Sequence, residues 1–421
     1  MTSSDITLEA VSSISQIPAA DWDACATSKA SLGDLAALDT LASPNPEGVG
    51  CVTSATSYNP FVSHAFFLAL EKSNSACART GWGPRHLIAR RDGAIVGVVP
   101  CYLKSHSQGE YVFDRGWADA YERAGGQYYP KLQASVPFTP ATGPRLLIRD
   151  PADAERIGAA LAGGLVGLAD AMEASSVHVT FARENEWKFL AEKGFLQRTD
   201  QQFHFHNEGY ATFDDFLATL NSRHRKAIKR ERRDALANGI TIHALTGADI
   251  TEDAWDAFFA FYMETGSRKW GRPYLTRAFY TLIGESMAED VALIMAKRDG
   301  KWIAGAINFI GSDTLFGRHW GAVEHHPFLH FEVCYYQAID FAIRRGLKTV
   351  EAGAQGEHKI ARGYLPQTTY SAHYIADPGF RRAVADYLKH ERAHVAEAVR
   401  ELTEAGPFRK GDIQSTHEEP T

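Results

Sequence analysis

One short stretch of this chain gathers residue types that can move protons and bind anions. Directly after an apolar strand-like run, residues 351–364 place two acids, a histidine, a lysine and an arginine among glycines. Glycine lets the backbone approach a ligand closely, and loops that leave rigid strands often carry catalytic groups. The pattern predicts a site that binds an anion and transfers a proton, although a solvated turn with surface charges would have the same composition. The candidate residues are Glu351, Gln355, Gly356, His358, Lys359, Arg362 and Tyr364.

A second charged stretch, residues 223–233, holds seven fixed positive charges and one negative charge, whereas the whole chain has a net charge of −7. Cations at this density are typical of contact with a polyanion, such as a tRNA backbone, a nucleotide diphosphate or an anionic lipid surface. The alternative is a solvated helix face that pairs with the acidic remainder of the chain. No aromatic residue alternates with the charges, so base reading is not expected. The proposed contacts are Arg223, Arg225 and Lys226.

A third segment, residues 317–332, contains four histidines and two acids. A metal site is not expected, because Pro327 interrupts any helix that would bring His326 and His330 together, and no H-E-x-x-H pattern is present. Histidines near a helix N-terminus can instead contact an anionic ligand or shuttle protons, or they can be structural. Together with Trp320, His319 and His326 are therefore candidate substrate contacts.

Two predicted hairpins organise the elements that must position these groups. The turns at 91–93 and 298–300 both read Arg-Asp-Gly, and the strand after each carries an early glycine, Gly97 or Gly305. In each half a helix that runs into a strand follows later. This repeat predicts two divergent copies of one mixed α/β unit. The predicted domains are 1–205, with a surface insertion at 26–58, and 206–408, followed by a disordered tail at 409–421.

Two long helices are expected to frame the second half of the chain. The first spans 212–238, with Thr212 as its N-cap and an apolar stripe that includes Phe216 and Ile228. The second begins at Pro378, has an apolar stripe on one face and ends before Gly406-Pro407.

Composition narrows the class of protein. The 421 residues are 45% hydrophobic and 11% aromatic, which are values of globular proteins. No apolar run approaches the roughly 20 residues that a membrane span needs, and the N-terminus does not resemble a signal peptide. The five scattered cysteines suggest reduced thiols in a cytoplasmic protein. No G-x-S-x-G, Walker or G-x-G-x-x-G pattern is present.

The chain resembles the FemAB-like proteins of the GNAT acyltransferase superfamily, and more narrowly a bacterial family of peptidoglycan biosynthesis or recognition proteins. The similarity extends from Asn59 to about Phe408 and implies two tandem GNAT-like domains, each a twisted mixed sheet flanked by helices. The motifs that carry it are Phe-Leu-His-Phe-Glu-Val-Cys-Tyr-Tyr-Gln at 328–337 and Glu-Ala-Gly-Ala-Gln-Gly-Glu-His-Lys-Ile-Ala-Arg-Gly-Tyr-Leu-Pro at 351–366, supported by Tyr-Val-Phe-Asp at 111–114 and Tyr-Tyr-Pro-Lys-Leu-Gln at 128–133.

Fem-type ligases transfer an aminoacyl group from tRNA to an amine of a cell-wall precursor. The resemblance therefore implies an acyl- or aminoacyltransferase with aminoacyl-tRNA or acyl-CoA as donor and no tightly bound cofactor. By resemblance Lys359 handles the negative charge of the substrate, and Arg362 is our own extension of that role. Two departures stand out: residues 324–330 lack the glycines of the coenzyme A loop, and one basic helix replaces the two-helix tRNA arm.

The resulting hypothesis is that Glu351 or His358 accepts a proton from the attacking amine while Lys359 and Arg362 hold a phosphate. Backbone N–H groups at 353–356 would contact the developing oxyanion. One alternative is a non-catalytic protein of the same fold that recognises a peptidoglycan or lipid precursor. Another is a nucleic-acid binder led by the basic helix. A phosphate-dominated complex should weaken steeply with ionic strength, whereas a neutral sugar–peptide complex should respond little.

Overall fold

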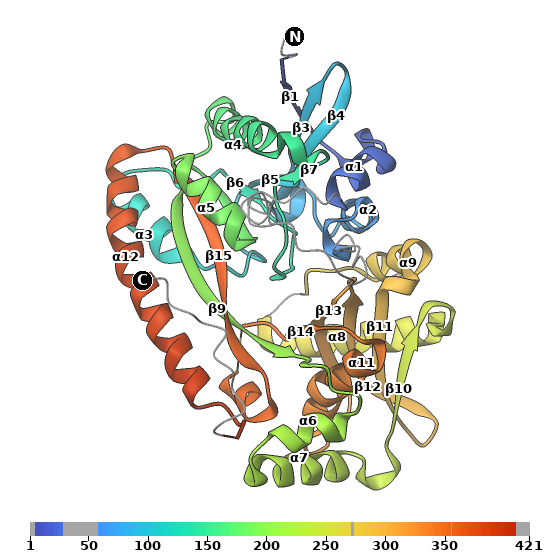
Figure 1. Cartoon of the computed structure of the whole chain (residues 1–421). Coiled ribbons are helices and arrows are strands. Elements are labelled where there is room, and N and C mark those ends of the chain that lie inside the picture. The colour runs from blue at the N-terminus through green and yellow to red at the C-terminus, as the bar shows by residue number, and fades with distance from the viewer. Residues whose placement is uncertain (1–4, 28–57, 271–272, 355, 410–421) are drawn as a thin grey trace, which may run out of the picture. The chain divides into compact units, whose positions relative to one another are not determined.

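The computed structural model describes residues 5–27, 58–270, 273–354 and 356–409 (Figure 1). Contacts divide the chain into two compact units. Unit 1 comprises residues 1–200, 274–286 and 369–394, and unit 2 comprises 201–273, 287–368 and 395–421. Each unit is mixed α/β, with helices beside a mixed sheet, so the predicted fold class is confirmed. Most of the 26–58 insertion and nearly all of the 409–421 tail lie outside the described residues.

This division differs from the single boundary expected near residue 205. Helix α9 (Arg277–Ser286) belongs to unit 1, where Phe279 packs edge-on against Phe66 of helix α2 with ring centroids 5.7 Å apart. The end of strand β15 (Leu365–Ile375) also belongs to unit 1, because it pairs with β8. Contacts between segments that are distant in the sequence therefore decide which unit each segment belongs to.

Unit 1 contains two sheets. In one the strand order is β1-β3-β4-β7, and in the other it is β2-β5-β6-β8-β15. Pro100, which has no N–H to donate to a ladder, separates β4 from β5. The first sheet consists of β1 (Thr7–Val11), β3 (His86–Arg91), β4 (Ala94–Val99) and β7 (Leu147–Ile148). The second contains β2 (Trp82–Pro84), β5 (Cys101–Lys104), β6 (Lys131–Ala134), β8 (Ser176–Ala182) and the end of β15.

Helix α4 (Ala154–Ala171) supplies much of the core of unit 1. Its residues Ile157, Leu161 and Leu165 are four positions apart, lie on one face and are fully buried. Each such side chain contributes about 1.5–3 kcal/mol when it is removed from water. The other helices of the unit are α1 (Ala19–Ala26), α2 (His64–Lys72), α3 (Arg115–Arg123), α5 (Glu184–Glu192), α9 and the first part of α12 (Pro378–Glu404).

The strands of unit 2 follow the order β10-β11-β12-β13-β14-β9-β15, and only the first residues of β15 belong to this unit. Strands β10 to β13 form an antiparallel meander, β14 runs parallel to β13, and β9 runs antiparallel to β14. The strands are β9 (Leu196–His206, whose last part belongs to this unit), β10 (Thr241–Thr246), β11 (Val291–Arg298), β12 (Lys301–Ile310), β13 (Thr314–Ala322) and β14 (Thr349–Glu351).

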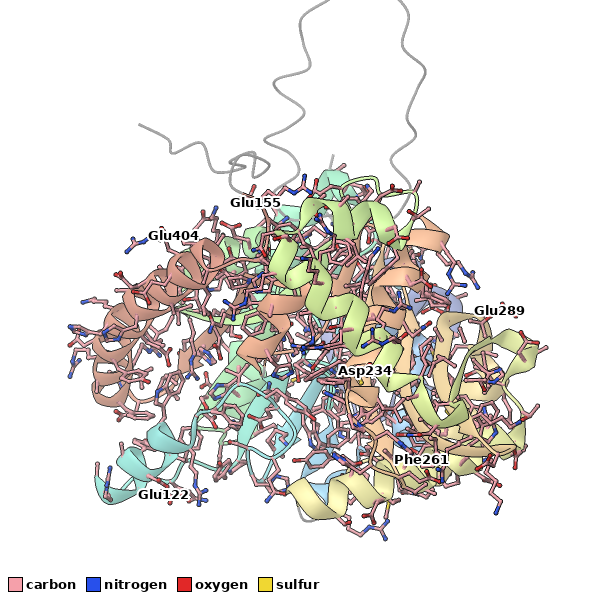
Figure 2. All side chains as sticks on the ribbon, turned by 90° about the horizontal axis from the view of Figure 1, so that it is seen from below. Glu122, Glu155, Asp234, Phe261, Glu289 and Glu404 are labelled. Carbon is pink, nitrogen blue, oxygen red and sulfur yellow. The ribbon has the colours of Figure 1, made fainter. Side chains whose placement is uncertain are left out.

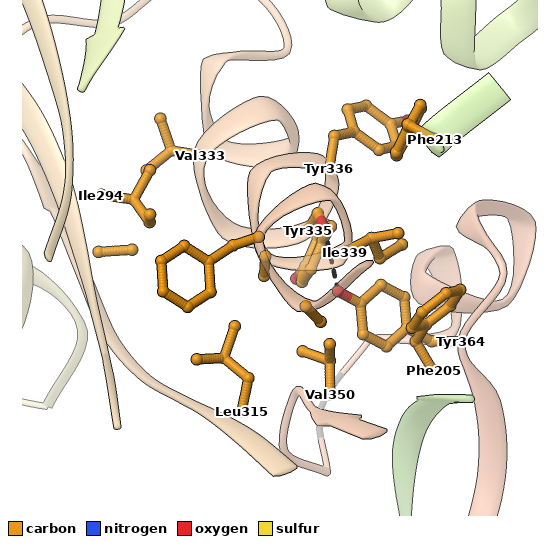
Figure 3. Close-up of a cluster of buried hydrophobic side chains, with 14 of the residues drawn as sticks. Phe205, Phe213, Ile294, Leu315, Val333, Tyr335, Tyr336, Ile339, Val350 and Tyr364 are labelled. Carbon is orange, nitrogen blue, oxygen red and sulfur yellow. Dashed lines mark hydrogen bonds between the residues drawn. The ribbon is translucent and has the colours of Figure 1, made fainter. Parts of the chain in front are cut away.

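A helix with a π-helical turn packs on this sheet. It consists of α10 (Leu329–Phe331), the π-turn Glu332–Tyr336 and α11 (Gln337–Arg345), and it ends at Gly346 in the left-handed conformation. Figure 3 shows its apolar face meeting residues such as Ile294, Leu315 and Val350. The unit also contains α6 (Phe213–Thr219), α7 (Ser222–Ala235), α8 (Glu252–Trp270) and the end of α12. Among the described residues, no helix combines the length and the apolar character that crossing a membrane requires.

Both hairpins form as predicted. Asp92 and Asp299 each adopt a φ of 49° at the turn. The glycine after each turn is required by close packing. A Cβ on Gly97 would lie 2.8 Å from Cγ2 of Ile157, and a Cβ on Gly305 would lie 2.4 Å from Sδ of Met295.

The helix predicted over 212–238 is wrong as one element, because the structure breaks it into α6 and α7. Leu220 is extended and forms an isolated β-bridge with Phe408, and the N–H of Asn221 donates to the carbonyl of Pro407. Asn221 then caps α7 by accepting from the N–H of His224 at 3.1 Å. The predicted cap of α6 is confirmed, since Thr212 forms a capping box. Asp234 lies near the far end of α7 (Figure 2) and accepts two hydrogen bonds from Arg233, at 3.0 and 2.9 Å.

Candidate functional site

Glu351 ends β14 in the interior of the unit 2 sheet. Its register partners are Phe316 on β13 and His204 on β9, and its side chain is buried. Backbone pairing continues past the strand, since Ala352 N–H donates to Phe203 O at 3.0 Å and Phe203 N–H donates to Gly353 O at 3.2 Å. The start of the 351–364 segment is therefore held to β9 by its backbone.

Lys359 closes the loop that follows. It lies in the short 3₁₀ helix η11 (Glu357–Arg362), and its Nζ donates to the carbonyl oxygens of Ala352 at 2.5 Å and Gly353 at 3.0 Å. The side chain is 3% exposed, and burial lowers its pKa from 10.5 to about 8. A lysine with this pKa exchanges its proton near neutral pH, which an ordinary surface lysine does not.

His358 lies beside Lys359 but faces outward. Its Nε2 is 3.1 Å from the hydroxyl of Tyr335, and its ring packs near Phe331 with centroids 5.4 Å apart. Partial burial lowers the pKa of His358, and the neighbouring Arg362 and Lys359 lower it further. The imidazole is therefore neutral at pH 7 and can accept a proton.

Arg362 is bound from both sides. Its Nη2 contacts the Glu231 carboxylate at 3.0 and 2.9 Å, its Nη1 donates to His358 O at 2.6 Å, and its guanidinium carbon lies 3.5 Å from the ring centroid of Phe331. The Tyr336 hydroxyl also donates to Glu231. Glu231 was not among the residues predicted from the sequence. It is the single acid among the cations of 223–233, and this difference from its neighbours could have indicated an inward-facing partner for a cation.

A second ion pair ties α7 to the π-turn. Arg232 contacts Glu332 through Nε and Nη2, with distances from 3.0 to 3.3 Å, and lies over the ring of Phe213. Glu332 is fully buried and also accepts from Gln337 Nε2 at 2.7 Å. One positive charge that the sequence assigned to polyanion binding is thus neutralised inside the unit.

The π-turn places Tyr335 between the site and the core. A π-turn displaces a carbonyl from the regular helical ladder, and such turns are frequent at functional sites. The Tyr335 carbonyl accepts from the hydroxyl of fully buried Tyr364 at 3.1 Å (Figure 3). The predicted residue Tyr364 therefore supports the backbone that carries Tyr335, which in turn contacts His358.

The other predicted residues do not all join this group. Trp320 reaches His358 only through His330. The ring centroids of Trp320 and His330 are 5.2 Å apart, and those of His330 and His358 are 6.4 Å apart. His319 packs against Tyr262, and burial lowers its pKa to about 3. His326 is 2.8 Å from Glu324, in a cluster that includes Arg298.

The remaining candidates are Gly356, Gln355 and three cations of α7. Gly356 precedes η11 with a φ of 101°, whereas Gln355 lies outside the described residues. On α7, Arg223 and Lys226 are exposed and Arg225 is half-buried. Across the described part of the chain, no three histidine, cysteine or acidic side chains are grouped as a metal site would require.

The sequence pattern of the FemAB-like family, described as peptidoglycan biosynthesis/recognition, matches residues 13–410. The chain belongs to this family. The resemblance drawn from the 328–337 and 351–366 motifs is thereby confirmed, and both motifs of this FemAB-like protein lie in the geometry described above. A comparison with curated proteins finds no match.

Several solved structures resemble this FemAB-like protein at low sequence identity. FemX is 13% identical, with 73% of this chain and 92% of that chain covered at a TM-score of 0.48. A tandem GNAT protein from the clavulanic acid biosynthesis pathway is 13% identical, covers 89% and 99%, and has a TM-score of 0.44. L-PGS from Bacillus licheniformis is 9% identical, covers 82% and 98%, and has a TM-score of 0.46.

Proposed function

We propose that this protein transfers an acyl or aminoacyl group to an amine of a cell-envelope precursor or another small molecule. Its membership of the FemAB-like family supports a transferase related to peptidoglycan. The observation that carries the proposal is that a buried lysine, whose pKa is lowered to about 8, and an outward-facing histidine, whose pKa is also lowered, are neighbours in η11, which follows an interior strand. Perturbed titratable groups of this kind concentrate at functional sites.

In this mechanism His358 accepts the proton that the amine loses as it attacks the acyl carbonyl. The Tyr335 hydroxyl, 3.1 Å from Nε2, fixes the orientation of the imidazole. A lysine ammonium has three N–H donors, and Lys359 directs two of them to the carbonyls of Ala352 and Gly353. The third donor would stabilise negative charge that develops on the substrate. Glu351, which is buried behind this loop, would orient the segment or relay the proton.

Arg362 takes a different role in this proposal from the phosphate contact expected from the sequence. Its guanidinium is bound to the Glu231 carboxylate and to a backbone carbonyl, and binding a phosphate would require breaking this pair. We therefore assign Arg362 the positioning of η11. The cations at the exposed surface of α7, which include Arg223 and Lys226, would attract the polyanionic part of an acyl-CoA or aminoacyl-tRNA donor.

The second candidate is a binding protein that recognises a peptidoglycan or lipid precursor without chemistry. The observation in its favour is that both Lys359 and Arg362 already donate to protein oxygens. In that case the 351–364 segment would be a stable recognition loop.

The two candidates are distinguished by a transfer assay with defined donors, namely acetyl-CoA and aminoacyl-tRNA, and with amine-bearing cell-wall precursors as acceptors. We expect Lys359→Met to lower turnover by about 100- to 1,000-fold, the usual effect of losing one oxyanion donor. We expect His358→Gln to lower turnover by about 100- to 10,000-fold, the usual contribution of a general base. The matched control is Lys348→Met, because Lys348 is exposed and directly precedes β14. Precursor binding by the wild-type protein with no product, and weakened binding by both site variants, would refute the transferase and leave the recognition protein.

A further inference from the structure

The second sheet of unit 1 has a polar face that the proposed transfer site does not use. Adjacent strands place Tyr102 opposite Gln133, Lys104 opposite Lys131, and Gln133 beside His178. Directly paired residues point to the same face of a sheet, so these side chains form one patch. All of them are buried. The opposite face of the same strands is the apolar core, with Cys101, Leu132, Ala134, Val177 and Val179.

Lys131 is fully satisfied within this patch. Its three ammonium protons match three acceptors, Ser107 Oγ at 2.8 Å, Glu110 Oε2 at 2.7 Å and Asp114 Oδ2. Asp114 Oδ2 also accepts from the Tyr128 hydroxyl at 2.7 Å. Each carboxylate thus uses one oxygen in this network and keeps its second oxygen for another partner.

Lys104 is not satisfied in the same way. Its Nζ makes one long hydrogen bond, 3.3 Å to the carbonyl of Gln108, and lies 3.6 Å from the ring centroid of Trp82. It is 3.8 Å from Glu110 Oε1, too far for a hydrogen bond. Burial lowers its pKa to about 7, although Glu110 acts in the opposite direction. The ammonium therefore lacks a full set of partners, and a bound carboxylate would supply one.

Five buried polar atoms around the patch have no hydrogen-bond partner within the described ranges. Two are donor groups, Trp82 Nε1 and the Tyr102 hydroxyl, and three are acceptors, Glu110 Oε1, Asp114 Oδ1 and Gln133 Oε1. Tyr102 and Gln133 are direct cross-strand neighbours, yet the hydroxyl and the amide oxygen do not bond to each other. Buried polar groups are almost always paired in proteins, so donors and acceptors left together indicate a ligand with both kinds of group.

The segments over the patch are held in uncommon backbone conformations. Tyr111 has a φ of 61° and Phe138 a φ of 59°, and Phe138 N–H donates to the carbonyl of Gly109 at 3.1 Å. Aromatic residues rarely adopt positive φ, and such positions concentrate at ligand clamps. Tyr111 and Asp114 belong to a motif that supported the family resemblance and that the proposed transfer chemistry does not use.

We propose that this face of unit 1 binds a small zwitterion of the α-amino acid type. The carboxylate of the ligand would meet Lys104, Trp82 Nε1 and the Tyr102 hydroxyl. Its ammonium would meet the unpaired oxygens of Glu110, Asp114 and Gln133. The buried charges of the patch, two lysines and two carboxylates, sum to zero when all are ionised, so a neutral ligand with separated charges fits better than a net ion. This inference goes beyond the proposed transfer and does not depend on it.

The test is thermal unfolding of the full chain with each protein amino acid in turn, compared with ethylamine, propionate and glycinamide at the same concentration. We expect at least one amino acid to raise the Tm in a concentration-dependent way. The three analogues, each of which lacks either the carboxylate or the ammonium group, should leave the Tm unchanged. Calorimetric titration then gives the Kd. If no amino acid shifts the Tm, or if an analogue shifts it as much, the proposal is overturned, and ordered water alone would satisfy these atoms.

Two variants locate the site. Tyr102→Phe removes an unpaired hydroxyl, so it should raise the Tm without ligand and weaken amino acid binding by about 10- to 100-fold, the effect of one hydrogen bond to a charged group. Lys359→Met should leave that binding unchanged, which separates this inference from the transfer proposal. Unchanged affinity in Tyr102→Phe, or lost affinity in Lys359→Met, would overturn the assignment to unit 1.

Discussion

The ion pair between Glu231 and Arg362 gives the sharpest test of how α7 supports the candidate site. Only 11% of the Glu231 side chain and 9% of the Arg362 side chain are exposed, and both carboxylate oxygens contact one guanidinium nitrogen. Glu231→Gln keeps the shape but leaves an uncompensated buried arginine and weakens the contact with Tyr336. Breaking a buried pair in this way costs about 3–5 kcal/mol, and we expect about 3 kcal/mol because each side chain reaches solvent at its edge.

For a unit of this size, that loss should lower the Tm by about 6–12 °C, at about 2–4 °C per kcal/mol. Thermal unfolding followed by circular dichroism and urea unfolding are the assays. The matched control is Asp214→Asn on α6, because Asp214 pairs with Lys229 of α7 at 2.9 Å while both side chains are largely exposed. We expect that control to change stability by less than about 1 kcal/mol.

The double variant Glu231→Gln/Arg362→Met tests the cause. If the buried charge is responsible, removing it should recover part of the loss, and the two single changes should not add. A Glu231→Gln variant that loses less than about 1 kcal/mol, or a double variant whose loss equals the sum, would refute the reasoning. Either result would mean that η11 is positioned by packing on Phe331 and not by charge.

Three further predictions concern single groups. The pKa of Lys359 is lowered on folding, so between pH 8 and 10.5 the unfolded chain binds more protons than the folded chain. The free energy of unfolding of the wild-type protein should therefore rise through that window by up to about 3 kcal/mol relative to Lys359→Met. Equal pH dependence of urea unfolding in the two proteins would contradict this prediction. Tyr364→Phe leaves the Tyr335 carbonyl without its donor and should cost about 1–3 kcal/mol in the same assay, so no loss would mean that this carbonyl has another partner. Gly97→Ala forces a Cβ against Ile157 and should cost about 1–3 kcal/mol, whereas a neutral result would show that α4 can shift.

Local sequence signals predicted the elements that depend on local chemistry. The Asp-Gly turns of both hairpins, the N-cap at Thr212 and the start of α12 at Pro378 all form where the pattern indicated. Phe380 N–H donates to Asp377 Oδ1 at 2.6 Å, which is the kind of N-terminal contact that an Asp-Pro pair predicts. In each case the residues that decide the conformation are neighbours in the sequence.

Features decided by distant residues were not predictable in this way. The break between α6 and α7 depends on Pro407 and Phe408, which lie near the C-terminal end of the described chain, far from α6 in the sequence. The inward direction of Glu231 depends on Arg362 from the loop after β14. The candidate site was located by its composition, but the partners that hold it in place were found only through the tertiary structure.

The charge that α7 can offer to a ligand is smaller than its sequence suggests. Of the seven cations in 223–233, three pair with acids: Lys229 with Asp214, Arg232 with Glu332 and Arg233 with Asp234. Within the part of the chain that the structure describes, four cations have no ion pair, namely Arg223, Arg225, Lys226 and Arg230. If these four alone meet the phosphates of a double-stranded DNA probe, the logarithm of affinity should fall with the logarithm of salt concentration at a slope of about −3.6. A slope near that of all seven cations, about −6.3, would mean that binding opens the inner pairs, and Arg232 would then leave Glu332 buried without its counterion.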